Sequence, residues 1–366
     1  MSLARELKKA NKACRVVYIG LRGEKVEELS SRYEVFDEAY TIAAGKFRRY
    51  HGESFLRQLL DIRTLLLNIR DFFKVSAGVF SARRLLGRIK PDVVFSKGGF
   101  VVVPVGIAAR WRKVPIITHD SDVTAGLANR ILARWAVVRT SGQQSAAGDS
   151  RFVGIPVGER LKPVTDSSQR GFKRLIGIPS RAELLLIAGG GLGARDINER
   201  MVSIMPRLLM NNPNLYVVHI TGSQNEKEVR DAYQISAEDA HRLTVIGFSN
   251  EFDKYSAAAD LIVSRAGATA LAEFAAQHKA VLLIPATHLA SGHQLENARD
   301  LQKRRAVKVL DNEVPTQKLF NTVDDLLNNK TALRDLGTNL GKLANPSAAA
   351  DLAKIILDVA YRYKKN

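Results

Sequence analysis

Short runs of apolar, often β-branched residues alternate along the chain with stretches of helical periodicity. This alternation is typical of α/β proteins, whose parallel strands are buried on both faces. Between residues 55 and 73 apolar side chains recur at helical spacing, which predicts an amphipathic helix with Ile69 and Phe73 on its apolar stripe and Asp71 on its polar stripe. The runs that predict buried strands are 15–19, 92–95, 115–118, 184–188, 216–220, 261–264 and 281–285.

Chain length and one irregular segment predict two domains. A chain of 366 residues exceeds what a single hydrophobic core usually fills. The segment 153–166 contains two glycines and two prolines without clear periodicity, which is typical of a linker. We therefore expect an α/β domain over 1–152, a linker over 153–166, a second α/β domain over 167–344, and a last helix within 345–366 that Asn345 caps and Pro346 begins.

Charge and cysteine content narrow the partners and the compartment. The formal net charge of +18 favours an anionic partner, which by charge alone could be nucleic acid, an acidic lipid or a phosphate-bearing substrate. Basic residues concentrate between 46 and 90, where 11 lysines and arginines accompany 3 acidic residues. The lone Cys14 cannot form an internal disulfide, no secretory leader opens the chain, and the longest apolar stretch, near 100–109, is too short for a bilayer. We expect a cytoplasmic protein that does not cross the membrane.

The segment 184–200, LLLIAGGGLGARDINER, has the pattern of a strand, a glycine turn and a helix start. Its glycines, Gly191 among them, let a ligand approach the backbone, and free N–H groups at a helix N-terminus suit phosphate oxygens. The same turn could serve only to pack the strand against the helix. A dinucleotide site is disfavoured, because Thr221 and Gly222 follow the next strand where an acidic residue should bind a ribose hydroxyl. We expect no cofactor.

Two further strand-turn-helix units follow. In LIVSRAGATALAEF (261–274), small residues leave the helix start at Ala268 open to a phosphate, and Glu273 could bind ribose hydroxyls or be an ordinary surface acid. In PATHLASGHQLENARDL (285–301), polar side chains crowd a loop and a helix start, which favours a sugar-binding loop over a metal site that lacks a third ligand of firm spacing. These side chains are His288, His293, Gln294 and Asn297.

The first half of the chain offers a glycine pair and an acidic pair. Gly98 and Gly99 follow the strand 92–95, with the positive charge of Lys97 beside them. Asp120 and Asp122 form an Asp-x-Asp after the strand 115–118, a pattern by which one class of sugar transferases holds a divalent metal on the donor diphosphate. One metal site does not account for the three units downstream, so we expect no metal.

Together these motifs resemble the MurG family, bacterial transferases that add N-acetylglucosamine to undecaprenyl-pyrophosphoryl-N-acetylmuramoyl-pentapeptide, and the likeness runs through nearly the whole chain. The matching stretches are KPDVV, KGGFVVVP, His119 with GLANRILARWA, GGGLGARDIN, RAGATALAE, and GHQLENA with Leu301. The resemblance implies a GT-B architecture: two Rossmann-like domains with parallel sheets, a cleft between them, and a last helix that returns to the first domain. It also implies an inverting, metal-independent glycosyltransferase that moves N-acetylglucosamine from UDP-N-acetylglucosamine to lipid I, giving lipid II in peptidoglycan synthesis.

The resemblance assigns roles to individual residues. It implies that Glu273 binds the ribose hydroxyls, that Gln294 binds the sugar, and that the backbone of Ser249 contacts the uracil edge. Gly98 and Gly99 are implied to lie beside the acceptor pyrophosphate. The implied donor-binding set is Asp122, Gly191, Ser249, Ala268, Thr269, Ala270, Leu271, Ala272, Glu273 and Gln294.

Several positions depart from the family pattern. Asp122 carries a carboxylate where the family has a donor-contacting amide. Gly158 replaces the family's arginine, for which Arg160 is a possible stand-in, and Gly191 replaces a serine.

The family's first strand and its Gly-Gly-Thr-Gly-Gly-His turn, which carries the commonly proposed base, are not found before residues 3–9. Either the sequence begins at a downstream start or the protein has lost part of its acceptor site. His119 and Asp120 are the candidate catalytic base in its place, and His119 fits a structural hydrogen bond to a backbone carbonyl equally well.

A lipid-linked acceptor requires the first domain to touch the cytoplasmic face of the cell membrane, as a peripheral protein. The alternative for the basic segment is an ordinary core-facing helix over 59–73 whose arginines are solvated. The residues expected at the headgroup boundary are Phe72, Phe73, Val79 and Phe80, and those expected on anionic lipid are Arg70, Lys74, Arg83, Arg84 and Arg88.

The expected partners are UDP-N-acetylglucosamine, the lipid-linked muramyl-pentapeptide and an anionic membrane surface, without nucleic acid. Three other functions stay open at this point. They are a transferase with another lipid acceptor, a nucleotide-sugar epimerase, and a truncated non-catalytic protein that binds a UDP-sugar or nucleic acid.

Overall fold

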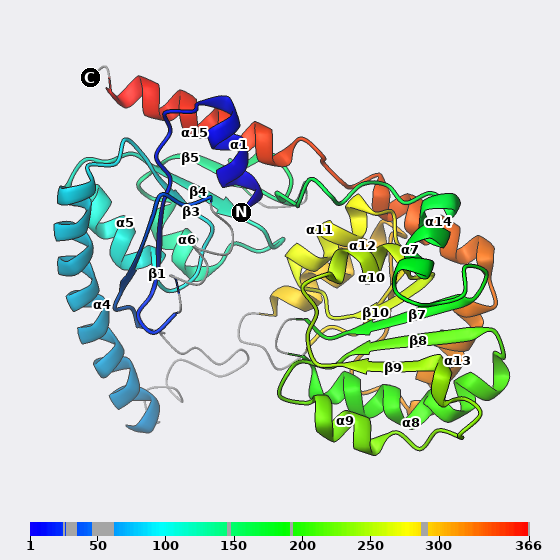
Figure 1. The fold of residues 1–366 in the computed structure, drawn as a ribbon. Helices are drawn as coiled ribbons and strands as arrows, with labels where there is room; N and C mark the ends of the chain where they lie inside the picture. The colour runs from blue at the N-terminus through cyan, green and yellow to red at the C-terminus, as the bar shows by residue number, and fades with distance from the viewer. Residues whose placement is uncertain are drawn as a thin grey trace. The chain divides into compact units, whose positions relative to one another are not determined.

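The computed structural model describes residues 1–24, 26, 35–45, 62–144, 148–190, 193–286 and 292–364, with side chains of the long helix α4 from residue 68 onward. The chain forms two compact units: unit 1 is Met1–Gly158 with Asn345–Asn366, and unit 2 is Glu159–Ala344. Each is an α/β assembly in which helices flank parallel strands (Figure 1). The predicted fold class is confirmed, and the chain first leaves unit 1 after Gly158, inside the predicted linker.

Unit 2 is built on one parallel sheet in the order β12-β11-β10-β7-β8-β9. Its first strand, β7, lies in the middle; the chain adds β8 and β9 on one side and then β10 to β12 on the other. The strands are β7 (Glu183–Ala188), β8 (Leu215–Ile220), β9 (Leu243–Ile246), β10 (Leu261–Ser264), β11 (Val281–Leu283) and β12 (Lys308–Val309). The helices are α7 (Asp166–Leu175), α8 (Arg195–Asn211), α9 (Glu226–Ala232), the short 3₁₀ turn Ala240–Arg242, α10 (Phe252–Ala258), α11 (Ala268–Ala276), α12 (His293–Lys303), α13 (Thr316–Leu327) and α14 (Lys330–Gly341).

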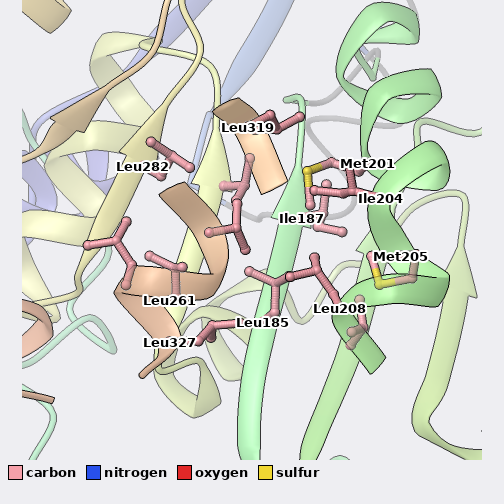
Figure 2. Close-up of a cluster of buried hydrophobic side chains, with 14 of the residues drawn as sticks. Leu185, Ile187, Met201, Ile204, Met205, Leu208, Leu261, Leu282, Leu319 and Leu327 are labelled. Atoms are coloured by element: carbon pink, nitrogen blue, oxygen red, sulfur yellow. The ribbon is translucent and has the colours of Figure 1, made fainter. Parts of the chain in front are cut away.

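The core of unit 2 lies on both faces of its sheet because successive strand side chains point to opposite sides. On β7, Leu185 and Ile187 pack against α8 and α13, as Figure 2 shows, while Leu184 and Leu186 pack against α11 on the other face. All four side chains are fully buried. Each contributes about 1.5–3 kcal/mol by leaving water, which explains the uninterrupted apolar run in the sequence.

Unit 1 contains two separate parallel sheets. The first pairs β1 (Val17–Leu21) with β2 (Glu38–Ile42), and the second has the order β3-β4-β5-β6. Helices α1 and α15 pack together on one face, and α4, α5 and α6 cover the other. The remaining elements are β3 (Val94–Ser96), β4 (Ile116–Asp120), β5 (Ala136–Ser141), β6 (Arg151–Phe152), α1 (Ser2–Ala10), α4 (Ile62–Ile89), α5 (Val102–Trp111), α6 (Leu127–Leu132) and α15 (Ala348–Lys364).

The chain returns from unit 2 to unit 1 after Ala344 and ends in α15. Asn345 Nδ2 donates to the carbonyl of Val153 at 2.8 Å, so the returning segment is fixed beside the departing one. Gly154 has φ +78°, and a Cβ there would lie 2.7 Å from that of Asn345, so this close approach requires glycine. The helix begins at Ala348, two residues after the predicted start at Pro346, because the Asn345 side chain bonds Val153 and the Ser347 amide instead.

All seven predicted strands are present, with ends displaced by at most two residues. The sequence pattern missed β2 and β5, which mix polar and apolar residues and are only partly buried, and it also missed β9. It also missed β6 and β12, which are only two residues long. In the part of the chain that the structure describes, no helix is both long and apolar enough to span a bilayer.

Candidate active site

The three predicted strand-turn-helix units of unit 2 meet at one edge of its sheet. They follow β7, β10 and β11, which are neighbours in the sheet, so their turns and helix N-termini lie side by side at the carboxyl ends of the strands. Ligands of open α/β sheets bind at this edge. Gly191 lies outside the described residues. Gly193 has φ +77°, and a Cβ there would clash with the carbonyl of Thr221, so this glycine serves packing.

Helix α11 presents an open N-terminus at this edge. Gly267 precedes it in an extended conformation, no described side chain caps it, and the first intrahelical bond runs from the Leu271 amide to the Gly267 carbonyl. The amides of Ala268, Thr269 and Ala270 therefore have no helical partner and suit phosphate oxygens. Glu273 is half-buried on the next turn of the same helix, four residues after Thr269 and so on the same face. Leu271 is buried and Ala272 is half-buried. The groups that α11 offers to the implied donor site are therefore its first backbone amides and the Glu273 carboxylate, rather than apolar side chains.

Gln294 stands in the first turn of α12 with half of its amide already engaged. Its Oε1 accepts a hydrogen bond from the Ala286 amide at 3.0 Å, so the NH₂ group is the part left to bind a sugar hydroxyl. Asn297 is buried and donates to the Ala266 carbonyl at 3.1 Å, which makes it a link between α12 and the turn after β10 rather than a sugar contact. His288 lies outside the described residues, and His293 Nδ1 is buried without a partner among the described ones.

The loop after β9 contains the predicted uracil contact. Ser249 uses its hydroxyl to accept a hydrogen bond from the Glu251 amide at 3.0 Å, which fixes the turn before α10. A contact through the Ser249 backbone is compatible with this arrangement, because the side chain is occupied locally. Phe248 beside it is exposed.

An arginine that the sequence pattern did not single out holds this edge together. Arg265, just after β10, donates to the Ile284 carbonyl at 2.8 Å and forms an ion pair with Asp196 in the first turn of α8. Burial raises the pKa of the Asp196 carboxyl, but hydrogen bonds from Arg265 outweigh this and lower it below its ordinary value. Arg265 thus fixes the helix that follows the glycine turn.

In unit 1 the glycine pair also lies at a strand end. Gly98 and Gly99 follow β3 with φ of +91° and +95°, a backbone conformation that favours glycine. The Gly98 amide donates to Ser96 Oγ at 3.3 Å, and no described atom lies within 4 Å of a Cβ built on Gly99. The pair therefore offers exposed backbone for an anionic group.

Asn129 of α6 connects this glycine turn to β4, and the sequence pattern did not predict its role. Its Oδ1 accepts from Ser96 Oγ at 2.6 Å, and its Nδ2 lies 2.9 Å from both the His119 carbonyl and Asp120 Oδ1. The side chain is buried. The only signal in the sequence is an asparagine within the GLANRILARWA stretch.

We expect Asn129→Leu to lower the free energy of unfolding by about 2–4 kcal/mol, because Ser96, Asp120 and a backbone carbonyl lose a buried partner together. Urea unfolding measures this change. The matched control is Asn321→Leu on α13, where the exposed side chain accepts a hydrogen bond from the Gln317 side chain. A loss no larger than in the control would show that the Asn129 network contributes little.

His119 has a structural environment that argues against its predicted role as the base. Thr140 Oγ1 uses its hydrogen on the Thr118 carbonyl at 3.0 Å, so His119 Nδ1 donates to that oxygen at 3.1 Å and Nε2 is the unprotonated nitrogen. Burial, followed by the charge of Lys97, lowers the pKa of His119 to about 3, so the completely buried ring stays neutral. The partner is a threonine hydroxyl and not the backbone carbonyl that we expected.

Asp120 is likewise engaged. Its carboxylate accepts from Asn129 Nδ2 at 2.9 Å and from the Gly126 amide at 3.3 Å, which positions the start of α6. Asp122 follows in the same loop of unit 1, and its contact with the donor stays a prediction. Among the described residues no three histidine, cysteine or acidic side chains gather as a metal site.

Helix α4 exposes Ile69 and Phe73, the two residues of the predicted apolar stripe whose side chains the structure describes, and also Phe72 and Phe80. Phe72, Phe73 and Phe80 are 59%, 67% and 66% exposed, and Ile69 is also exposed, so the core-facing alternative is wrong for this part of the helix. The buried face is formed instead by Asp71, Val75, Gly78, Val79, Ala82 and Leu86. Two predictions are therefore corrected: Asp71 is not on a solvated stripe, and Val79 cannot contact a membrane.

Basic and aromatic residues continue this exposed face. Arg70, Lys74, Arg83, Arg84 and Arg88 are all exposed on α4. Trp111 at the end of α5 is exposed as well, and the Arg83 guanidinium lies 5.8 Å from its ring centre. We call Ile69, Phe72, Phe73, Phe80 and Trp111, together with these five basic residues, the α4 face.

Comparison with known proteins places the two units in one family. Residues 1–138 match the glycosyltransferase family 28 N-terminal domain and residues 184–354 match its C-terminal domain. The UDP-N-acetylglucosamine--N-acetylmuramyl-(pentapeptide) pyrophosphoryl-undecaprenol N-acetylglucosamine transferase of Listeria monocytogenes serotype 4a is 30% identical over 366 residues, 98% of this chain and 95% of that protein. The chain belongs to the MurG family. The Halothermothrix orenii transferase of the same name is 33% identical over 303 residues, covering 79% of this chain and 80% of that protein.

Solved structures agree with the MurG family and its two-domain GT-B fold. The MurG crystal structure from Acinetobacter baumannii has a TM-score of 0.74 at 25% identity, over 98% of this chain and 94% of that one. A UDP-N-acetylglucosamine 2-epimerase from Neisseria meningitidis, bound to UDP-N-acetylglucosamine, has a TM-score of 0.64 at 15% identity over 99% of this chain and 95% of that one. The second likeness shows a shared fold and does not favour epimerase activity.

Proposed function

We propose that this protein transfers N-acetylglucosamine from UDP-N-acetylglucosamine to an undecaprenyl-pyrophosphoryl-N-acetylmuramoyl-pentapeptide, the step that completes the lipid-linked disaccharide of peptidoglycan. The observation that carries the proposal is the match of both units to the MurG family, together with the shared edge of β7, β10 and β11 in unit 2. That edge offers open helix amides, an acidic side chain and an amide, which are the kinds of group that can bind the diphosphate and the hydroxyls of a UDP-sugar.

In the proposed reaction the acceptor hydroxyl attacks the sugar C1, the C1–oxygen bond to the diphosphate breaks, and UDP leaves. The N-termini of α8 and α11 stabilise the negative charge that develops on the diphosphate. Glu273 orients the ribose and the Gln294 NH₂ group orients the sugar. The acceptor pyrophosphate binds the backbone at Gly98 and Gly99 beside the positive Lys97, and a group other than His119 takes the proton.

The direct test is an assay with radiolabelled UDP-N-acetylglucosamine and a soluble lipid I analogue. We expect labelled disaccharide-lipid and UDP in equal amounts. Formation of N-acetylmannosamine or its nucleotide without lipid would instead identify an epimerase. Binding of the UDP-sugar without any turnover would identify a non-catalytic protein.

The donor site is predicted to depend on Glu273 and Gln294. Alanine at either position should weaken UDP-N-acetylglucosamine binding by ~1–3 kcal/mol, because a directional hydrogen bond to a hydroxyl is lost. Gln294→Glu separates two roles, since it keeps an acceptor for the Ala286 amide but removes the NH₂ donors; we expect it to weaken binding as alanine does. Calorimetry measures the affinities, with the exposed Glu296→Ala of the same helix as control. Wild-type affinity in all three variants would remove both residues from the donor site.

We also propose that the transfer needs no metal ion. The support is that Asp120, half of the Asp-x-Asp motif, already binds Asn129 and the Gly126 amide. A chelator should therefore leave the transfer rate unchanged within about twofold, since helix amides supply the charge stabilisation. Loss of activity that Mn²⁺ or Mg²⁺ restores would return Asp120 and Asp122 to the site as metal ligands.

We propose further that the protein works as a peripheral protein at the inner face of the cell membrane, through the α4 face. The acceptor's long lipid chain stays in the bilayer, so unit 1 must approach the surface to reach the pyrophosphate. Exposed aromatic side chains beside arginines are the arrangement that enters a headgroup boundary and meets anionic lipid. Nucleic acid is not an expected partner.

A further inference from the structure

Three polar side chains connect α9, β8 and α8 in unit 2. The hydroxyl of Tyr233, which follows α9, lies 2.7 Å from His219 Nδ1 on β8. On the other side of the ring, His219 Nε2 lies 3.0 Å from Asn198 Oδ1 in the first turn of α8. His219 and Asn198 are buried, Tyr233 is half-buried, and α8 and α9 pack together on the same side of the sheet (Figure 1). We call these three residues the His219 network.

The direction of each hydrogen bond in the His219 network follows from Asn198. Its Nδ2 donates to the Thr221 carbonyl at 3.0 Å, so its Oδ1 is the acceptor that faces the ring. His219 Nε2 therefore carries the proton, and Nδ1 accepts from the Tyr233 hydroxyl. Burial lowers the pKa of His219 to about 3 and raises the pKa of Tyr233 above its ordinary value. Both groups therefore stay neutral near pH 7, which fixes these directions.

The network ends on the wall of the glycine turn that follows β7. The Thr221 carbonyl accepts a second side-chain amide, Asn225 Nδ2, also at 3.0 Å, so both of its lone pairs are used. A Cβ on Gly193 would clash with this carbonyl oxygen, so the turn packs directly against it. The Gly193 amide donates to the Gly190 carbonyl at 2.9 Å and closes the turn. The position of the Thr221 carbonyl therefore limits where the turn can lie.

Asn198 also belongs to the start of α8 itself. Its backbone amide donates to the Ala194 carbonyl at 2.9 Å, the first hydrogen bond of the helix, and no side-chain cap precedes it among the described residues. The amides of the first turn before Asn198 have no helical partner and can meet an anion. One buried asparagine thus joins the helix start to the wall of the glycine turn.

We propose that Tyr233, His219 and Asn198 are positioning residues that hold the glycine turn and the α8 N-terminus in place for the donor diphosphate. The inference rests on the proposed function, which assigns charge stabilisation to this helix start. The three side chains act through the Thr221 carbonyl and the helix backbone rather than by contact with the donor. A buried network of this kind keeps one arrangement, because a shift would leave buried polar groups without partners.

The other parts of the donor are assigned to other elements. The proposed function gives the ribose to Glu273 of α11, and the resemblance gives the uracil edge to the backbone of Ser249 in the loop after β9. Loss of the His219 network should therefore weaken ligands that carry the diphosphate. It should spare uridine, which has the base and the ribose without phosphate.

The test uses Asn198→Leu in the full chain, with a control at the other end of the same helix. Asn212, just after α8, is also buried, and its Nδ2 donates to the Leu208 carbonyl at 3.0 Å and to Asp324 Oδ1 at 2.8 Å. Asn198→Leu and Asn212→Leu each remove one buried amide from the packing of α8, so both should lower Tm. Tyr233→Phe is a milder variant that removes one hydroxyl from the network. Calorimetry measures UDP binding, and ligand-observed NMR measures uridine binding.

We expect Asn198→Leu to weaken UDP binding about tenfold and Tyr233→Phe about threefold, because the supporting groups of a binding site fix its geometry. Uridine affinity should stay within about twofold of wild type in both variants. Asn212→Leu should bind UDP and uridine as the wild type does, in spite of its lower Tm. A role in stability alone would not separate the two ligands or the two ends of the helix.

UDP affinity that is unchanged in both Asn198→Leu and Tyr233→Phe, or equally reduced in Asn212→Leu, would overturn the inference. An equal loss of UDP and uridine would also overturn it, because the network would then support the whole donor site and not its phosphate edge. These results leave the proposed function standing. A wild-type chain that binds no UDP would contradict the proposed function and this inference together.

Discussion

Replacing Phe72 and Phe80 by serine and Arg83 and Arg84 by glutamine should weaken binding to anionic vesicles roughly 100-fold. Each arginine near an anionic surface contributes about 1 kcal/mol, and the two exposed rings add burial in the headgroup boundary. Sedimentation with vesicles that contain phosphatidylserine measures the effect. Wild-type binding should fall with added salt, because the screening length shortens to about 3 Å at 1 M.

The control for this prediction is a unit 2 variant with the same kinds of change. Leu175, Met210, Arg170 and Arg181 are exposed there, so serine at the first two and glutamine at the last two remove the same charge and two exposed apolar side chains. That variant should sediment as the wild type does. The α4 variant should still bind UDP-N-acetylglucosamine, since the proposed donor contacts on α11 and α12 are untouched. If the two variants sediment alike, the α4 face is not the membrane face.

Because of Lys279, the free energy of unfolding of unit 2 should increase as the pH rises from 8 to 10. Lys279 follows the end of α11 by three residues, its side chain is buried, and its ammonium nitrogen donates to the Ala257 carbonyl at 3.1 Å. Burial lowers the pKa of Lys279 to about 8, although Asp260 and Asp166 act to raise it while Lys173 lowers it. In the unfolded chain the pKa lies higher, at about 10.4, so the unfolded state binds more protons in this window and folding becomes more favourable as pH rises.

The measurement compares wild type with Lys279→Met by urea unfolding at pH 7 and pH 10. The difference between their free energies of unfolding should change by roughly 2–3 kcal/mol in favour of wild type at the higher pH. The exposed Lys227→Met should show no such change. Parallel pH profiles for wild type and Lys279→Met would mean that Lys279 keeps its charge and a solvated environment.

The strand-turn-helix units could be predicted because each depends on local pattern alone: an apolar run, small residues in a turn, and a helix start. Their meeting at one edge depends on sheet order, which single segments do not encode. Arg265 and Asn129 were missed for a related reason. Arg265 bonds Asp196, 69 residues away, and Asn129 bonds Ser96, 33 residues away, so neither function is visible in the neighbouring sequence.

Helix α4 shows the limit of periodicity itself. The pattern correctly indicated an amphipathic helix, but the helix runs to Ile89 and buries a face that contains Gly78 and Ala82. A Cβ on Gly78 would clash with the Ala43 carbonyl, so close packing selects small residues there. The bulkiest apolar side chains are left outside. Hydrophobicity identified the two faces and did not decide which one meets the core.

Because unit 2 is inserted between Gly158 and Asn345, the core of unit 1 is completed by residues that are synthesised after all of unit 2. Leu352, Ile356 and other α15 side chains pack against Leu7 and Ile117. On the ribosome, unit 2 can therefore bury its core while unit 1 still lacks a wall, the reverse of the usual N-terminal-first order. A chain whose synthesis stalls after unit 2 and before α15 would carry a finished second unit and an open, aggregation-prone first one.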